Sequence, residues 1–147
     1  MSEACFRAYA ESDRSACLAI FDANCPEFFA PNERDDYLGF LDSGSDGYEV
    51  CLLNDRVAGA FGVFAHGEDS VSLNWILLDP DVQGVGIGSK IMTRAIEAAG
   101  SHDAKALAIA ASHKSAPFFE RFGAVAQEFT EHGWGPDMHR IDMSLPI

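Results

Sequence analysis

The stretch Gln83-Gly84-Val85-Gly86-Ile87-Gly88 lies between an apolar run at 71–78 and a helical pattern that begins at Ile87. A loop that holds a pyrophosphate needs backbone N–H groups that point into one concavity at the start of a helix, and side chains would obstruct that concavity. The three glycines therefore predict an anion-binding turn. A tight strand-to-helix turn without a ligand is the alternative interpretation.

Two common nucleotide-binding motifs do not fit this spacing. A Walker loop needs Gly-Lys followed by Ser or Thr, whereas the order here is Gly88-Ser89-Lys90. The dinucleotide motif GxGxxG needs a third glycine, and the sequence has Ser89 or Ile91 at the two positions that would complete it. The predicted ligand is therefore neither of these nucleotide classes.

The segments on both sides of the loop predict a parallel crossover. Ile87, Ile91, Met92 and Ala95 share one helical face, and the helix is expected to stop near Gly100. A short apolar strand at 106–110 follows, so that the unit 71–110 reads as strand, helix and parallel strand. Upstream, the alternating segments 48–52 and 57–64 predict antiparallel partners for 71–78.

The other predicted elements complete the fold. They are a strand at 5–8, a helix capped by Ser12, a helix capped by Asn32, a short helix at 115–122, and strands at 125–130 and 138–145. We therefore predict a single α/β domain over residues 1–147, with a mixed, mostly antiparallel central sheet of about seven strands and about four helices.

Composition excludes several function classes. Ten basic and 23 acidic residues give a formal charge of −13, which disfavours nucleic acids and favours cationic ligands. There is no signal-peptide pattern and no apolar run of about 20 residues, so we expect a cytoplasmic protein with no membrane association. The Cys and His residues lack metal-ligand spacing, and no metal is predicted. The sequence is compatible with a homodimer and does not set the oligomeric state.

A longer pattern indicates a family. Gln83, Gly86 and Gly88 form Gln-x-x-Gly-x-Gly at the start of the Ile91 helix, and this motif resembles the acetyl-coenzyme A loop of the GNAT superfamily of N-acetyltransferases. Downstream, Ser112 and the segment 118–123 resemble the second cofactor segment of that family. The order of predicted strands and helices agrees over nearly the whole chain.

The resemblance implies a binding site for acetyl-coenzyme A. Loop amides would bind the pyrophosphate, the backbone of two strand residues would pair with the pantetheine arm, and three further residues would line its far side. The implied residues are Leu77, Leu78, Gln83, Gly84, Val85, Gly86, Ile87, Gly88, Ser89, Ser112, Phe118 and Phe119.

Catalytic groups are harder to assign. Phe119 stands where the family often has a tyrosine acid, and it has no proton to give. The run 70–78 has no carboxylate, although family members commonly place a base there. Asn74 could orient a water or an amine, or could be a structural strand residue. His132 is expected on a loop between the last two strands and has a pKa suited to proton transfer.

An aromatic set is expected on loops around the acceptor. It comprises Phe28, Phe29, Tyr37 and Trp134, which could cover a cationic or apolar amine or could simply pack in the core. The neighbouring acids Glu33, Asp35 and Asp36 favour a cationic acceptor. The predicted reaction is transfer of an acetyl or short acyl group from acetyl-coenzyme A to a primary amine of a small molecule or peptide. The alternative, suggested by Phe119 and the missing strand carboxylate, is a non-catalytic acyl-coenzyme A sensor.

Overall fold

The computed structural model describes residues 4–67, 70–82 and 86–147. Gln83, Gly84 and Val85 of the predicted cofactor loop lie outside the described residues. The α-helices are α1 (Arg14–Ala23), α2 (Glu33–Ser43), α3 (Ile87–Ser101) and α4 (Ala116–Glu120). The strands are β1 (Cys5–Ala8), β2 (Tyr48–Leu53), β3 (Arg56–Ala65), β4 (Val71–Leu78), β5 (Ala106–Ser112), β6 (Val125–Gly135) and β7 (Met138–Pro146). Two 3-10 helices cover Glu11–Asp13 and Pro80–Val82.

All these strands belong to one sheet, in the order β1-β2-β3-β4-β5-β7-β6. Every neighbouring pair is antiparallel except β4 and β5, which run parallel because α3 carries the chain back between them. The predicted α/β architecture is thereby confirmed: within the described residues the sheet is mixed, has seven strands and is accompanied by four α-helices. None of the described helices is long and apolar enough to cross a membrane.

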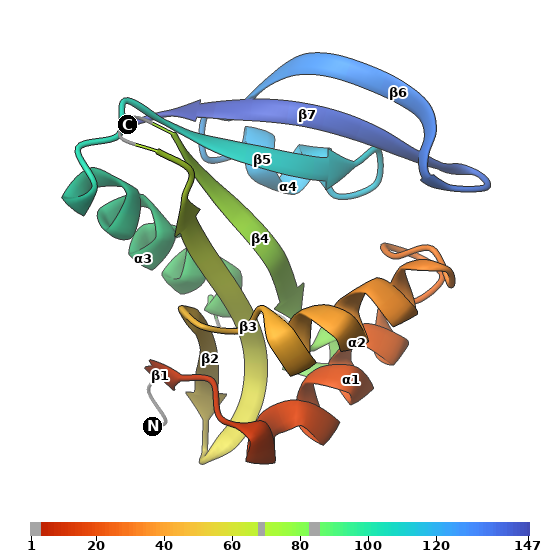
Figure 1. The fold of residues 1–147 in the computed structure, drawn as a ribbon, viewed down its shortest axis with the longest axis vertical. Helices are drawn as coiled ribbons and strands as arrows, with labels where there is room; N and C mark the ends of the chain where they lie inside the picture. The colour runs from red at the N-terminus through yellow and green to blue at the C-terminus, as the bar shows by residue number, and fades with distance from the viewer. Residues whose placement is uncertain (1–3, 68–69, 83–85) are drawn as a thin grey trace.

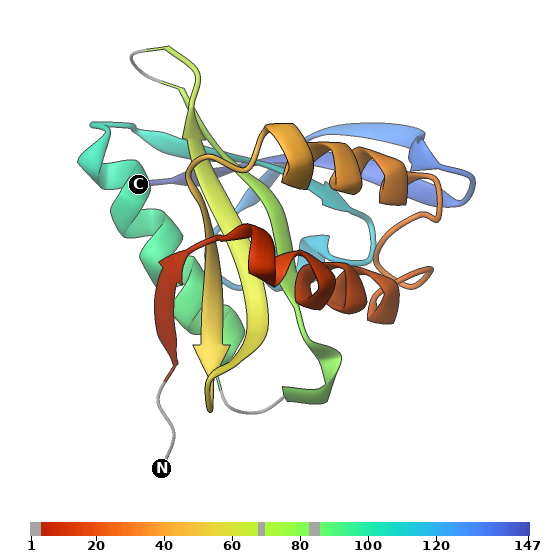
Figure 2. The same ribbon diagram turned by 60° about the horizontal axis from the view of Figure 1, so that its bottom comes forward.

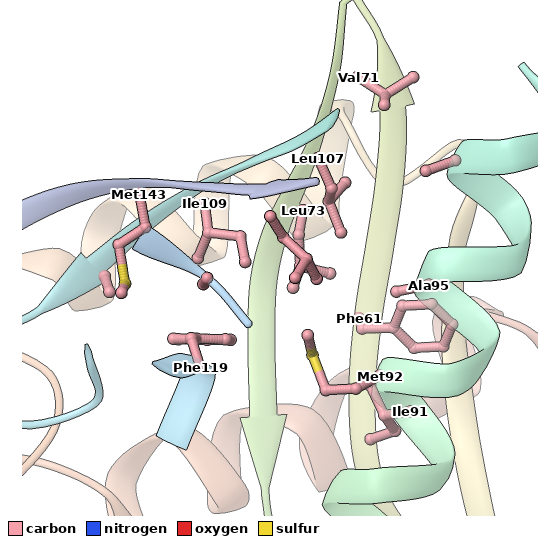
Figure 3. Packing of buried hydrophobic residues seen from close by; sticks show 14 of the residues in the cluster. Phe61, Val71, Leu73, Ile91, Met92, Ala95, Leu107, Ile109, Phe119 and Met143 are labelled. Atoms are coloured by element: carbon pink, nitrogen blue, oxygen red, sulfur yellow. The ribbon is translucent and has the colours of Figure 1, made fainter. Parts of the chain in front are cut away.

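Helices cover both faces of the sheet. Figures 1 and 2 show α3 on one face and the pair α1 and α2 on the other. The α3-side core joins α3 and α4 to β3, β4, β5 and β7, and Figure 3 shows Met92 and Phe119 among its side chains. The α1–α2-side core contains Phe21, Tyr37 and Leu77. Each helix thus buries its apolar stripe against the sheet, as amphipathic helices do.

A β-bulge in β4 changes which face of the sheet its side chains reach. Two residues of β4, Trp75 and Ile76, lie where the register with β3 shifts, opposite Phe61. Because side chains alternate along a strand, the extra residue puts Leu73 in the α3-side core and Leu77 in the α1–α2-side core. Trp75 has φ of 50°, a left-handed conformation that is rare for a bulky residue.

The strands β4 and β5 pair over only part of their length. The ladder runs from Val71 opposite Leu107 to Leu73 opposite Ile109, and no further pair joins the two strands among the described residues. Figure 1 shows the strands diverging beyond this point. The edge of β4 at 74–78 therefore faces a gap in the sheet. An extended group placed in this gap could form hydrogen bonds with the backbone N–H and C=O groups of β4.

Two predicted boundaries were wrong. Ser12 is no helix cap but lies in the first 3-10 helix, and α1 begins after Asp13, whose carboxylate accepts a hydrogen bond from the Ala10 N–H and pairs with Arg7 at 2.6 Å. Helix α3 ends at Ser101, the residue after the predicted stop at Gly100. Strand β6 runs five residues beyond Thr130 to Gly135, so that the expected loop is part of a hairpin.

Candidate functional site

The gap between β4 and β5 opens into a cavity of about 790 Å³. Four parts of the chain form its wall: residues 73–78 of β4, the end of β5, the region of α4, and the segment from the end of α1 to the start of α2. Trp134 of β6 closes one side. The cavity therefore brings together segments that are far apart in the sequence.

The β4 wall contains three residues singled out from the sequence. Asn74, Leu77 and Leu78 all line the cavity. The carbonyl oxygen of Leu78 accepts a hydrogen bond of 2.9 Å from the Asn24 side-chain amide, which also donates to the Ile20 carbonyl at 2.9 Å. Asn24 thus fixes the end of β4 to the end of α1.

Replacing Asn24 with alanine is expected to destabilise the fold. The change leaves the carbonyl oxygens of Ile20 and Leu78 without this donor near a residue that is 92 % buried, at a cost of about 1–3 kcal/mol in the free energy of unfolding. Urea unfolding measures this cost. Asn32→Ala is the matched control. Among the described residues the exposed Asn32 side chain makes one hydrogen bond, to the Trp134 carbonyl, and its loss should cost less than about 1 kcal/mol. Equal costs for the two variants would contradict the bridging role of Asn24.

The opposite wall is built by the end of β5 and α4. The Ser112 N–H donates to the Ser115 hydroxyl oxygen at 3.0 Å, and the Ser115 N–H donates to the Ser112 hydroxyl oxygen at 3.1 Å. These reciprocal hydrogen bonds give partners to two backbone N–H groups of the turn that leads into α4. Phe118 and Phe119 follow, with ring centroids 5.1 Å apart, and both line the cavity. The three residues predicted for the far side of a cofactor therefore form one wall.

The start of α3 lies next to this wall. A Cβ atom at Gly88 would approach Phe118 Cε1 to 2.8 Å and Leu78 Cδ1 to 3.3 Å, so only glycine allows the helix to come this close. Gly86, the residue before the helix, has φ of 76°, and the space around its Cα is open. The side chain of Ile87 lies in the α3-side core. The backbone N–H groups of Ile87, Gly88 and Ser89 belong to the first turn of α3, at the positive end of the helix dipole.

The aromatic residues predicted around an acceptor separate into two groups. Phe28, Phe29 and Trp134 line the cavity. The Trp134 indole N–H donates to the Ala111 carbonyl at 2.9 Å, which holds this ring against β5. The strand position of Trp134 corrects the predicted loop. The hairpin of β6 and β7 thus supplies one side of the cavity.

Tyr37 does not line the cavity, and that prediction was wrong. It lies in α2 with 0 % of its surface exposed, stacked on Phe21 at 5.6 Å between ring centroids. Its hydroxyl shares a hydrogen bond of 3.0 Å with the Tyr48 hydroxyl, which donates to the Trp75 carbonyl at 2.6 Å. Burial raises the pKa of the Tyr37 hydroxyl. Tyr37 therefore supports the bulge of β4 from behind and is available neither to a substrate nor as an acid.

Glu33 is a carboxylate of the cavity wall that the sequence did not single out as a reacting group. It begins α2, is 5 % exposed and lines the cavity with Phe29 and Asn74. Its Oε2 accepts a hydrogen bond of 2.7 Å from the Ala30 N–H. Burial raises the pKa of the Glu33 carboxyl to about 7, and the charge of Asp36 adds to this effect.

Comparison with known proteins identifies the family. A model described as the acetyltransferase (GNAT) family matches residues 17–124. The chain belongs to this family. The predicted resemblance and the predicted enzyme class are thereby confirmed. A comparison with curated proteins finds no match.

Solved structures share the fold of this GNAT acetyltransferase over nearly its whole length. Ard1 from Thermoplasma volcanium has a TM-score of 0.82 at 12 % identity, with 98 % of this chain and 97 % of that chain covered. The ribosomal-protein-S18-alanine N-acetyltransferase from Escherichia coli has a TM-score of 0.79 at 16 % identity, with 99 % and 94 % covered. The structure of yncA from Salmonella typhimurium, solved with its cofactor acetyl-CoA, has a TM-score of 0.72 at 16 % identity, with 99 % and 94 % covered.

His132 lies outside the cavity wall of the acetyltransferase. It is in β6, and its side chain is 48 % exposed. Its Nδ1 accepts a hydrogen bond of 2.8 Å from the Asp137 N–H, and its Nε2 is 3.5 Å from a carboxylate oxygen of Glu131. A general base must reach the amine directly or through one water. The geometry therefore gives no support to His132 as the base.

The remaining catalytic candidates differ in what they can do. Asn74 lines the cavity and makes no side-chain hydrogen bond within the described residues, so its amide is free to orient a water or an amine. Phe119 is 3 % exposed, belongs to the α3-side core and can only pack. Within 4–67, 70–82 and 86–147, no three His, Cys, Asp or Glu side chains are placed to hold a metal ion.

Proposed function

We propose that this acetyltransferase transfers an acetyl or short acyl group from acetyl-coenzyme A to a primary amine of a cationic small molecule or peptide. One observation carries the proposal: a single cavity extends from Leu78 and Phe118, which lie against Gly88, to Phe29 and Glu33. A donor held at the start of α3 and an acceptor held at the start of α2 would meet inside it. Transfer would take place in the cytoplasm.

The donor half of the cavity suits coenzyme A. The thioester supplies an activated acyl carbon and a thiol leaving group. The open edge of β4 at 74–78 offers backbone groups to an extended arm, and the glycines at 86 and 88 leave the start of α3 accessible to a pyrophosphate. Leu77, Leu78, Ser112, Phe118 and Phe119 would flank the arm, with Ile87 and Ser89 contributing backbone N–H groups. Gln83, Gly84 and Val85 would complete the anion site.

The acceptor half suits a cation with an apolar body. Phe28, Phe29 and Trp134 present aromatic rings, and Glu33 provides a negative charge. The net charge of −13 also favours a positively charged acceptor over an anionic one. A thiolate leaving group, with a pKa near 8.5, needs little help from an acid, so the absence of a hydroxyl at Phe119 does not prevent the reaction.

An acceptor screen tests the proposal. Release of thiol from acetyl-coenzyme A is measured with polyamines, arylalkylamines, amino acids, aminoglycosides and peptides. At least one primary amine is expected to raise the rate by at least about 100-fold over the rate without acceptor, and the corresponding alcohol should not. Tight binding of acetyl-coenzyme A with no acceptor-dependent release by any amine would favour the sensor and contradict the proposal.

A further inference from the structure

The two oxygens of Glu33 have different surroundings. Oε2 is fixed by the Ala30 N–H at 2.7 Å. Oε1 has no hydrogen-bond partner within the described residues, and none of their side-chain oxygens is both fully buried and unpaired. Oε1 is therefore not fully buried, and the residue that carries it lines the cavity. One oxygen anchors the group while the other is available to a ligand.

Glu33 also lacks a cation of its own. The neighbouring guanidinium of Arg34 pairs with Asp22, at 2.9 and 3.3 Å, and no Lys, Arg or His of the described residues forms an ion pair with Glu33. A carboxylate buried to this extent is costly unless it is paired or loses its charge. An ammonium group that enters the cavity would provide the missing partner.

The other charges near Glu33 do not replace that partner. Asp36 lies one turn further along α2 and disfavours the ionised form of Glu33. The remaining charged side chains of the cavity wall are Asp79 at the end of β4, and Lys114 and Arg121 near α4. From β4 itself, the side chains that line the cavity are uncharged. The Glu33 carboxyl, with its pKa raised by burial to about 7, can therefore both lose and accept a proton near neutral pH.

We propose that Glu33 is the catalytic base of the transfer, whose carboxylate binds the ammonium form of the acceptor and accepts its proton. This inference rests on the proposed function. Glu33 shares the cavity with the edge of β4 at 74–78, where the thioester would lie, and with the ring of Phe29, along which the body of the acceptor would pack. The acceptor class is thus a primary ammonium attached to an apolar or aromatic group.

The step balances as follows. One proton passes from the ammonium nitrogen to Glu33 Oε1, which leaves a neutral amine beside a neutral carboxyl group. The amine lone pair forms the N–C bond with the thioester carbon, and the C–S bond breaks with its electron pair on sulfur. The second nitrogen proton goes to the thiolate through water, and Glu33 then releases its proton to solvent. No oxidant, reductant or metal is required.

A Glu33→Gln variant tests this role against a purely structural one. The glutamine side chain keeps an oxygen that can accept from the Ala30 N–H, but it cannot take a proton. We expect kcat at pH 7 with phenethylamine to fall at least about 100-fold, while Kd for acetyl-coenzyme A, measured by calorimetry, changes less than about twofold. Glu27→Gln, at an exposed position in the same connection, is the matched control and should retain wild-type turnover. Wild-type turnover in Glu33→Gln would overturn the proposal.

The pH profile gives a second readout. For the wild type, kcat/KM is expected to rise with pH as Glu33 ionises and then to reach a plateau. The midpoint of the rise should lie near pH 7. For Glu33→Gln, the rate should follow the free amine and keep rising toward the amine pKa, about 10 for a lysine-like amine. If the kcat/KM profile of Glu33→Gln had the same midpoint as that of the wild type, the ionisation would belong to another group and the proposal would be overturned.

A binding experiment separates this inference from the proposed function. Side-chain carboxyl NMR of the wild type, assigned with Glu33→Gln, follows the titration of Glu33 without turnover. Phenethylamine is expected to lower its midpoint by at least about one pH unit, and phenethyl alcohol should leave it unchanged. If no amine supports thiol release, the proposed function fails, and the Glu33 inference is then judged by this shift alone. A midpoint that phenethylamine does not move overturns the inference even where thiol release is found.

Discussion

Gly86→Glu is expected to abolish the rise in melting temperature that acetyl-coenzyme A gives the wild-type protein. At a concentration of 100 times Kd the ligand should stabilise the wild type by about 2.7 kcal/mol, or about 5–10 °C for a chain of this length. Gly86 has φ of 76° directly before α3. A glutamate there would add a negative charge where the pyrophosphate would bind and would strain the backbone by about 1–2 kcal/mol. Thermal unfolding with and without ligand measures the loss.

Gly67→Glu is the matched control for this experiment. Gly67 also has a left-handed φ, 92°, and open space around its Cα, but it lies between β3 and β4, at the opposite end of β4 from the start of α3. The substitution adds the same charge and a similar backbone strain. The control should therefore lower the melting temperature without ligand while keeping the full shift with ligand. An equal shift in Gly86→Glu and Gly67→Glu would contradict a pyrophosphate site at the start of α3.

The architecture could be predicted because its signals are local and periodic. The bounds of β4 were predicted at 71–78, and β1 at 5–8, since alternation and turn residues mark both segments directly. The helical stripe of Ile91, Met92 and Ala95 identified the face of α3 that packs on the sheet. Such patterns state which face of an element is buried. They do not indicate which other elements pack against that face.

The details of the site depend on contacts that no local pattern encodes. The bulge at Trp75 turns the end of β4, and the divergence of β4 from β5 then decides which residues border a cavity. Tyr37 was expected near an acceptor and is in the core, whereas Glu33, one turn earlier, lines the cavity. The spacing of Glu33, Tyr37 and Leu41 at four-residue intervals could have revealed that Glu33 is on the buried face of α2.

Glu33→Gln is expected to make the protein more stable above pH 8 while leaving its stability near pH 4.5 almost unchanged. The folded state holds the pKa of Glu33 at about 7, against an ordinary value of 4.5. Between these two values the folded chain binds a proton that the unfolded chain has released, so the free energy of unfolding falls as the pH rises. Above pH 7 the accumulated cost is at most about 3 kcal/mol, because each pKa unit corresponds to about 1.36 kcal/mol.

The glutamine variant does not ionise and so avoids this cost. At pH 8.5 we expect its melting temperature to exceed that of the wild type by up to about 6–12 °C, and the difference should disappear as the pH is lowered through the interval from 7 to 4.5. Glu27→Gln, at an exposed position, should show no such difference at any pH. Equal stability of Glu33→Gln and the wild type at pH 8.5 would contradict a raised pKa. The proposed use of Glu33 in the reaction would explain why the chain keeps a carboxylate that costs stability at the pH where it is ionised, since a glutamine would suit the fold better.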